Sequence, residues 1–268
     1  MQLQSRTQVS KYLAKGKEQR RLLWKIWLFS IPVALFGFLG GIAEYLIGYF
    51  PSMIVHEIGH MTAGWLTGTP AISFFFASLY YPSLQSAGLL LVCILLEIAL
   101  FAYCSYRALY AISLGTACII LGHLYFLFFP GAAEFFITFG GMAGELVLPV
   151  LVTLVFFDVP TLLGSRLLLL LPICTLSFWF ALFEWLLAIF GMAPFPYPPD
   201  SAGGAALFQN PFETGVPKGD LDKLLAIHGW SESELTITYT SIALLMFLII
   251  GLLYLLDSNG AEEARSEE

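Results

Sequence analysis

The sequence predicts an all-α integral membrane protein. We expect a polytopic bundle of about six transmembrane helices, one additional short helix and a small β element at residues 71–80. Of the 268 residues, 58% are hydrophobic and only 12% are charged, whereas a soluble domain carries about 25% charged residues. The apolar residues form runs of about 20, the length that crosses a bilayer as a helix. This composition excludes intrinsic disorder, fibrous repeats and nucleic-acid binding.

The apolar runs define the predicted organisation of the chain. A basic arm (1–21) precedes a membrane domain (22–256), which contains a polar insertion (193–235) and is followed by an acidic tail (257–268). The candidate spans are 22–50, 84–106, 108–129, 132–157, 166–192 and 236–256.

The charges at the two ends predict the orientation of the chain. Seven of the twelve Lys and Arg residues lie in the first 25 positions, and the last twelve residues hold five acids and one Arg. Basic residues stay on the cytoplasmic side of a membrane, so we expect a cytoplasmic N-terminus and a retained first span. All four cysteines lie in apolar runs, and no Asn-x-Ser/Thr sequon occurs. These features fit a bacterial inner membrane.

Residues 52–67 are predicted to form the short helix. Pro51 ends the preceding span, Ser52 can cap the new helix, and Gly68 with Pro70 stops it. A helix of roughly 15 residues rises only about 22 Å, which is too short to cross the hydrocarbon core squarely.

Two further segments differ from the apolar spans. Residues 71–83 are aromatic and β-prone and too short to span, which predicts a strand or loop at membrane depth. The insertion 193–235 contains several prolines that forbid a regular span, followed by a short predicted helix at 220–228.

The motif that carries chemistry is His56-Glu57-Ile58-Gly59-His60, an HExxH pattern. On a helix, positions i and i+4 share one face, so both imidazoles can bind the same ion. Glu57 is then placed to take a proton from a water that the ion has acidified. The pattern predicts a zinc site with His56 and His60 as ligands and Glu57 as the catalytic general base.

A catalytic zinc needs a third protein ligand, and the sequence leaves several candidates open. The alternative roles are a helix cap for an acid in the polar insertion, and a buried hydrogen-bond partner for a His or Glu within a span. The candidates are Asp220, Asp200, His123, Glu145, Glu184 and His228.

The HExxH motif within an apolar helix, followed by further spans and a late Asp, resembles the site-2 protease family of intramembrane zinc metalloproteases. The resemblance is carried by residues 53–68 and implies His56 and His60 as zinc ligands and Glu57 as general base. It also implies an Asp ligand from a later helix opened by Asn-Pro. Asn210-Pro211 followed by Gly219-Asp220 fits this order, which favours Asp220 over Asp200, although the chain has no Leu-Asp-Gly.

We therefore expect a minimal, divergent member that hydrolyses membrane-protein or peptide substrates in a lipid bilayer. Two other functions fit the same residues. The first is a structural or regulatory metal site without proteolysis. The second is a transporter that uses the intramembrane acids, although no inverted repeat is visible.

Overall fold

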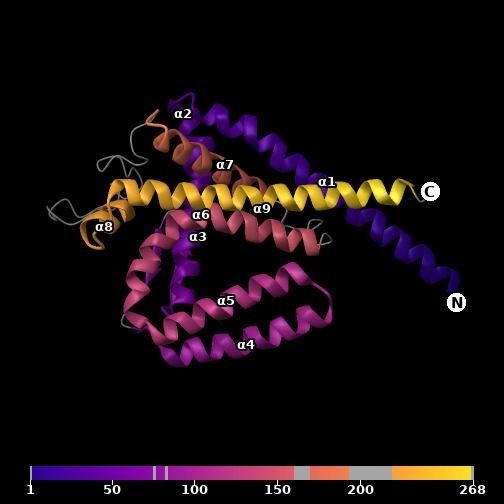
Figure 1. Cartoon of the computed structure of the whole chain (residues 1–268), viewed down its shortest axis with the longest axis horizontal. Coiled ribbons are helices and arrows are strands. Elements are labelled where there is room, and N and C mark those ends of the chain that lie inside the picture. Colours follow the sequence, from indigo (N-terminus) through magenta and orange to yellow (C-terminus); the bar gives the residue numbers. More distant parts are fainter. Residues whose placement is uncertain (1, 75–76, 82–83, 160–169, 193–218, 267–268) are drawn as a thin grey trace.

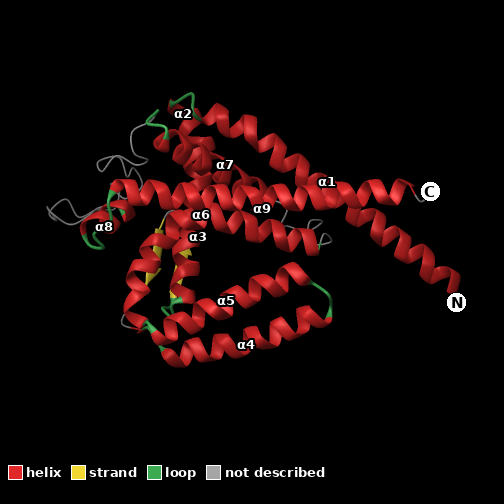
Figure 2. Cartoon of the chain, viewed as in Figure 1, coloured by secondary structure: helices red, strands yellow, loops and turns green. Residues whose placement is uncertain are grey.

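The computed structural model describes residues 2–74, 77–81, 84–159, 170–192 and 219–266, which are almost entirely helical (Figure 2). The elements in chain order are α1 (Gln2–Gly37), α2 (Gly41–Ala43), the π-helix η1 (Glu44–Tyr49), α3 (Phe50–Leu66), β1 (Ala71–Phe74), β2 (Ala77–Tyr80), α4 (Ala87–Tyr106), α5 (Tyr110–Phe128), the 3-10 turn η3 (Pro130–Ala132), α6 (Ala133–Asp158), α7 (Leu170–Ile189), α8 (Asp220–Ala226) and α9 (Glu232–Ser266).

Four of the described helices are long and apolar enough to cross a membrane. These segments are Ala87–Tyr106, Pro130–Phe157, Leu170–Ile189 and Glu232–Ser258. The apolar part of α5, Ile112–Phe128, is shorter. The helical membrane bundle is therefore seen, but only four of the six expected spans meet this length and hydropathy. Figure 1 shows α4 and α5 as a hairpin at one side of α3, with α7, α9 and α1 on the other side.

The predicted first span, 22–50, is wrong because the helix breaks inside it. α1 ends at Gly37, and the backbone turns through Gly40 and Gly41, whose φ angles are 85° and 63°. Glycine adopts this left-handed conformation without a Cβ penalty. The residues of the basic arm are part of α1, which is continuous from Gln2.

The helix with the HExxH motif is also longer than predicted, because Pro51 does not end the helix before it. α2, η1 and α3 form one helical run from Gly41 to Leu66, a rise of roughly 39 Å. In η1 the Phe50 N–H bonds the Tyr45 carbonyl, five residues back. Pro51 then falls in the first turn of α3, where a proline is tolerated.

Glycines bring α6 against α3 more closely than other residues allow. A Cβ on Gly144 would lie 2.5 Å from the Gly59 Cα, and one on Gly59 would lie 2.9 Å from the Gly141 carbonyl oxygen. Small residues permit this approach of two helices in a membrane. Two other glycines make different contacts: Gly64 faces β1 and Gly68 faces Leu90 of α4.

The predicted β element at 71–80 is confirmed as an antiparallel hairpin of β1 and β2, with Ala71 opposite Tyr80. The strands lie beside α3 (Figure 2). The hydroxyl of Ser78 donates a 2.7 Å hydrogen bond to the backbone carbonyl of Glu57. The Trp65 indole N–H donates to the Ala71 carbonyl. The hairpin is therefore attached to α3 at the HExxH motif and at the helix end.

The core lies between α1, α6, α7 and α9 and is rich in aromatic side chains, including Trp27, Phe178, Trp185 and Tyr239. The outer ends of α1 and α9 are also joined. Asp257 forms an ion pair with Arg20 at 3.0 Å and accepts a hydrogen bond from the Trp24 indole at 2.9 Å. Both chain ends consequently lie at the same end of the bundle (Figure 1).

Candidate metal centre

His56 and His60 of α3 point their rings toward one another across a single helical turn. The ring centroids are 4.7 Å apart, and the two Nε2 atoms are 3.1 Å apart. Their side chains are 18% and 10% exposed, so the pair is largely enclosed by protein. The i, i+4 spacing of the motif therefore gives the shared face that the sequence predicted.

Asp220, the first residue of α8, completes a group that could hold a metal ion. Its Oδ2 atom lies 2.8 Å from the Nε2 atoms of both His56 and His60, and the possible ligand atoms of the three residues lie within 4.8 Å of one another. The helix cap is Gly219, whose N–H bonds the Asp222 carboxylate. The helix cap considered for Asp220 is thus formed by Gly219 and Asp222 instead.

The outer ring nitrogens of the two histidines are held by hydrogen bonds. His60 Nδ1 lies 2.7 Å from the Ile137 carbonyl oxygen, which only accepts, so this nitrogen carries the proton. His56 Nδ1 lies 2.8 Å from Oε1 of Glu145, which is itself buried on α6. Such partners fix the tautomer and direct Nε2 toward a metal.

The possible ligand atoms of His56, His60 and Asp220 face one another. Metal binding requires Nε2 atoms without protons, and the hydrogen bonds at both Nδ1 atoms allow this tautomer in His56 and His60. Burial raises the pKa of Asp220, but the adjacent imidazoles outweigh it and hold the pKa well below its ordinary value. The carboxyl group is therefore ionised, and a cation between the three groups satisfies all of them.

The wall of the centre on the α6 side is Gly141. A Cβ there would lie 2.5 Å from His60 Nε2 and 2.6 Å from His56 Nε2. Any larger residue would occupy the space that faces the two nitrogens. Sequence analysis missed this role, although the spacing of Gly140, Gly141 and Gly144 is a signal for close helix packing that could have found it.

Glu57 is half-buried and lies next to His56 on α3. Its backbone carbonyl accepts the hydrogen bond from Ser78 of β2. Within the described ranges, its carboxylate has no recorded hydrogen-bond or ion-pair partner. An acid without a structural partner beside a metal group is available for proton transfer.

The other candidate ligands have different positions. Glu145 bonds the outer nitrogen of His56 and supports that ligand. His123 is buried on α5, bonds Glu97 of α4 at 2.8 Å and faces the Trp65 carbonyl at 3.3 Å. Neither residue belongs to the metal group in the described part of the chain.

Glu184 lies on α7, and the His228 ring packs edge-on against Phe135 at 5.3 Å. These two residues are also outside the metal group found among the described residues. Asp200 lies outside the described residues.

The Glu145 hydrogen bond predicts a measurable loss of metal affinity. We expect Glu145→Gln to weaken metal binding about tenfold, because the amide keeps an acceptor for His56 Nδ1 but loses the negative charge. Competition with a chromophoric zinc chelator measures this affinity. Glu97→Gln is the matched control. Glu97 bonds His123 at the same distance of 2.8 Å, and this pair lies outside the metal group. An equal loss in both variants would contradict the supporting role of Glu145.

Fold and site together define a helical membrane protein with a candidate His-His-Asp metal centre. Comparisons with protein-family models, with curated proteins and with solved structures gave no match.

Proposed function

We propose that this chain is a membrane-embedded zinc metalloprotease similar to the site-2 protease family, hydrolysing peptide bonds of membrane-associated substrates. The observation that carries the proposal is the meeting of His56, His60 and Asp220 beside Glu57. Asp220 is separated from His60 by 160 residues, so this meeting is not a consequence of local spacing.

The three ligands fit zinc by type and by distance. Two imidazoles and one carboxylate, with a further position open, are a donor set of catalytic zinc. Ligand atoms about 2.0 Å from a tetrahedral ion are about 3.3 Å apart. The separations of 2.8 and 3.1 Å in the structure are close to that value. His56, His60 and Asp220 would hold the ion.

The reaction needs a proton acceptor and donor, for which we propose Glu57. Zinc held by His56, His60 and Asp220 would supply a Lewis acid for a carbonyl group and would lower the pKa of water. Glu57 takes the proton of the attacking water and later passes it to the leaving amine. Glu145 and the Ile137 carbonyl keep the two imidazoles oriented throughout.

The β-hairpin supports an extended substrate conformation. A peptide bond within a helix is hydrogen-bonded and protected, so the scissile segment must be unwound. Among the described residues the β1–β2 sheet has two strands, and Ser78 of β2 attaches it to the HExxH motif. A substrate strand added to an outer edge of this sheet would lie close to Glu57.

The setting that we propose is a bacterial inner membrane with the N-terminus in the cytoplasm. The basic residues of the first 25 positions support this orientation. The four apolar helices support the membrane location.

Metal removal tests the proposal directly. We expect the purified full-length chain to contain a single zinc ion and to cleave transmembrane peptides in liposomes, with products identified by mass spectrometry. Stripping with 1,10-phenanthroline should abolish cleavage, and added zinc should restore it. His60→Ala should lose the zinc, whereas His123→Ala, a buried histidine outside the metal group, should keep it. A wild-type chain without zinc would refute the proposal.

A further inference from the structure

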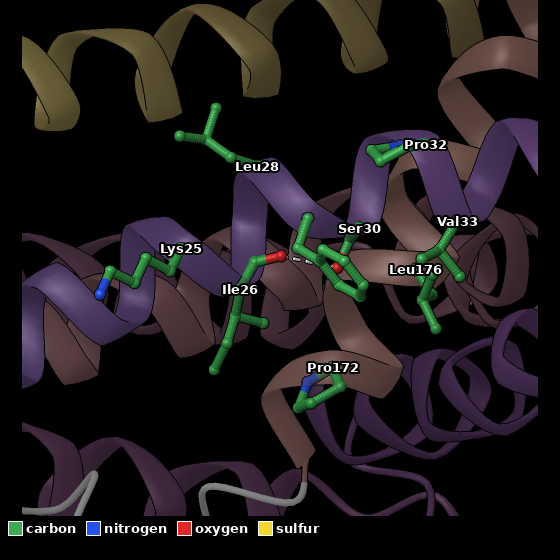
Figure 3. Close-up of a pocket in the computed structure, with 9 residues that line it drawn as sticks. Lys25, Ile26, Leu28, Ser30, Pro32, Val33, Pro172 and Leu176 are labelled. Carbon is green, nitrogen blue, oxygen red and sulfur yellow. Dashed lines mark hydrogen bonds between the residues drawn. The ribbon is translucent and has the colours of Figure 1, made fainter.

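An apolar groove runs along α1 where it packs on α7. It has a volume of about 840 Å³ and is lined mainly by side chains of Ile26, Phe29, Pro32, Val33, Pro172 and Leu176. Figure 3 shows Lys25 at one end of the row and Pro32 and Val33 at the other. The lining therefore changes from a cation to hydrocarbon along a single direction.

The floor of this groove offers no free hydroxyl group to an occupant. Ser30 bonds the Ile26 carbonyl at 2.8 Å and the Thr175 hydroxyl at 2.7 Å, which joins α1 to α7. Because both hydroxyls are satisfied within the protein, an occupant meets apolar surface along the groove.

The depth of the groove in a bilayer is set by the groups beside Lys25. Trp24 bonds Asp257, which follows directly on the apolar run of α9. Asp257 also pairs with Arg20, and charged groups are costly in hydrocarbon, so this level of α1 belongs near the headgroups. From Lys25 to Val33 the helix rises about 12 Å, slightly less than half of a hydrocarbon core about 30 Å thick. The groove is thus as deep as a single leaflet.

The cations at the mouth of the groove are uncompensated. Arg21 and Lys25 are one helical turn apart and both exposed, and in the described part of the chain neither has an acidic partner. Arg20, on the neighbouring face, is paired with Asp257. Two such cations above an apolar groove match a molecule that has a negatively charged headgroup and a hydrocarbon chain.

We propose that this groove binds an anionic phospholipid, with its phosphate at Arg21 and Lys25 and one acyl chain along Phe29 and Val33. A zwitterionic lipid of the same chain length fits the groove, but it has no net negative charge to neutralise the two cations. Each basic residue near an anionic membrane surface contributes about fivefold to binding, so the pair should contribute on the order of twentyfold. This site is independent of the metal centre.

Lipid retention in native mass spectrometry of the full-length chain tests the site. The probes are phosphatidylglycerol and phosphatidylcholine with identical acyl chains, added in equal amounts. We expect preferential retention of phosphatidylglycerol, reduced about twentyfold in the Arg21→Ala/Lys25→Ala double variant. Arg107→Ala, an exposed cation at the end of α4, should behave as wild type.

A groove-filling variant separates acyl-chain binding from charge alone. Val33→Trp keeps both cations and should retain less of both lipids, with an unchanged size-exclusion profile. Equal retention of the two lipids by the wild type would overturn the proposal. An unchanged preference in the double variant would also overturn it, and neither result bears on zinc or on cleavage.

Discussion

Replacing Glu57 by Gln is expected to lower kcat/KM for peptide cleavage by about 10²–10⁴-fold, the usual contribution of a general base. Glutamine has nearly the same shape but cannot take up the proton of water at neutral pH. The zinc content should not change, because Glu57 is not a member of the His56, His60 and Asp220 group. Cleavage of a transmembrane peptide in liposomes, together with zinc analysis of the same sample, measures both quantities.

Glu134→Gln is the matched control for this loss. Glu134 is an exposed acid in the first turn of α6, and the same substitution there should leave both zinc content and cleavage unchanged. If Glu57→Gln cleaved as fast as wild type, another group would be the base. That result would contradict the proposed role of Glu57 but not the metal site.

Asp220→Ala is expected to remove zinc from the centre almost completely. The carboxylate is the acidic member of the group, and its Oδ2 atom lies 2.8 Å from both Nε2 atoms. Loss of a direct ligand should exceed the 10–100-fold loss that is typical of a residue behind the ligands. We therefore expect zinc affinity to fall by more than about 100-fold, measured by chelator competition and by metal analysis.

Asp222→Ala provides a control on the same short helix. Asp222 bonds the Gly219 N–H and contributes to the start of α8, so its loss costs helix stability and not a ligand. Asp200→Ala tests the competing ligand that the sequence left open. Zinc that leaves Asp200→Ala but remains in Asp220→Ala would show that the assignment of Asp220 is wrong.

Much of the fold was accessible from the sequence because hydropathy and local turn signals act over short distances. The runs that became α4, α6, α7 and α9 are apolar enough to be recognised without any tertiary information. The end of α3 was predicted from Gly68 and Pro70, and in the structure Gly68 takes a φ of 75°, which few other residues adopt. The β element at 71–80 was likewise predicted from its own residues, which are aromatic and β-prone.

The errors in the first part of the chain also have a local cause. A proline usually interrupts a helix, so Pro51 was expected to begin a new element. The π-helical turn at Glu44–Tyr49 precedes it and keeps the run continuous. No simple sequence rule predicts where a helix will widen in this way. Gly48 of this turn lies close to the Phe180 ring of α7, a contact between distant parts of the sequence.

The candidate site could be predicted only in part. The HExxH spacing places His56 and His60 on one face of a helix by geometry alone. The partners of their outer nitrogens, Glu145 and the Ile137 carbonyl, depend on how α6 lies against α3. The sequence left Glu145 open as a possible ligand. Only the packing of α6 against α3 shows which nitrogen of His56 it contacts.

The distance along the chain between the metal-binding groups has a consequence for biosynthesis. His60 leaves the ribosome 160 residues before Asp220. At about 5–20 residues per second, the histidines wait roughly 8–32 s for the carboxylate. A nascent or truncated chain that ends before Asp220 carries the two imidazoles and Glu57 without their third partner. Completion of the candidate centre is therefore a late event, and under the proposed function an unfinished chain would be inactive toward its neighbours in the membrane.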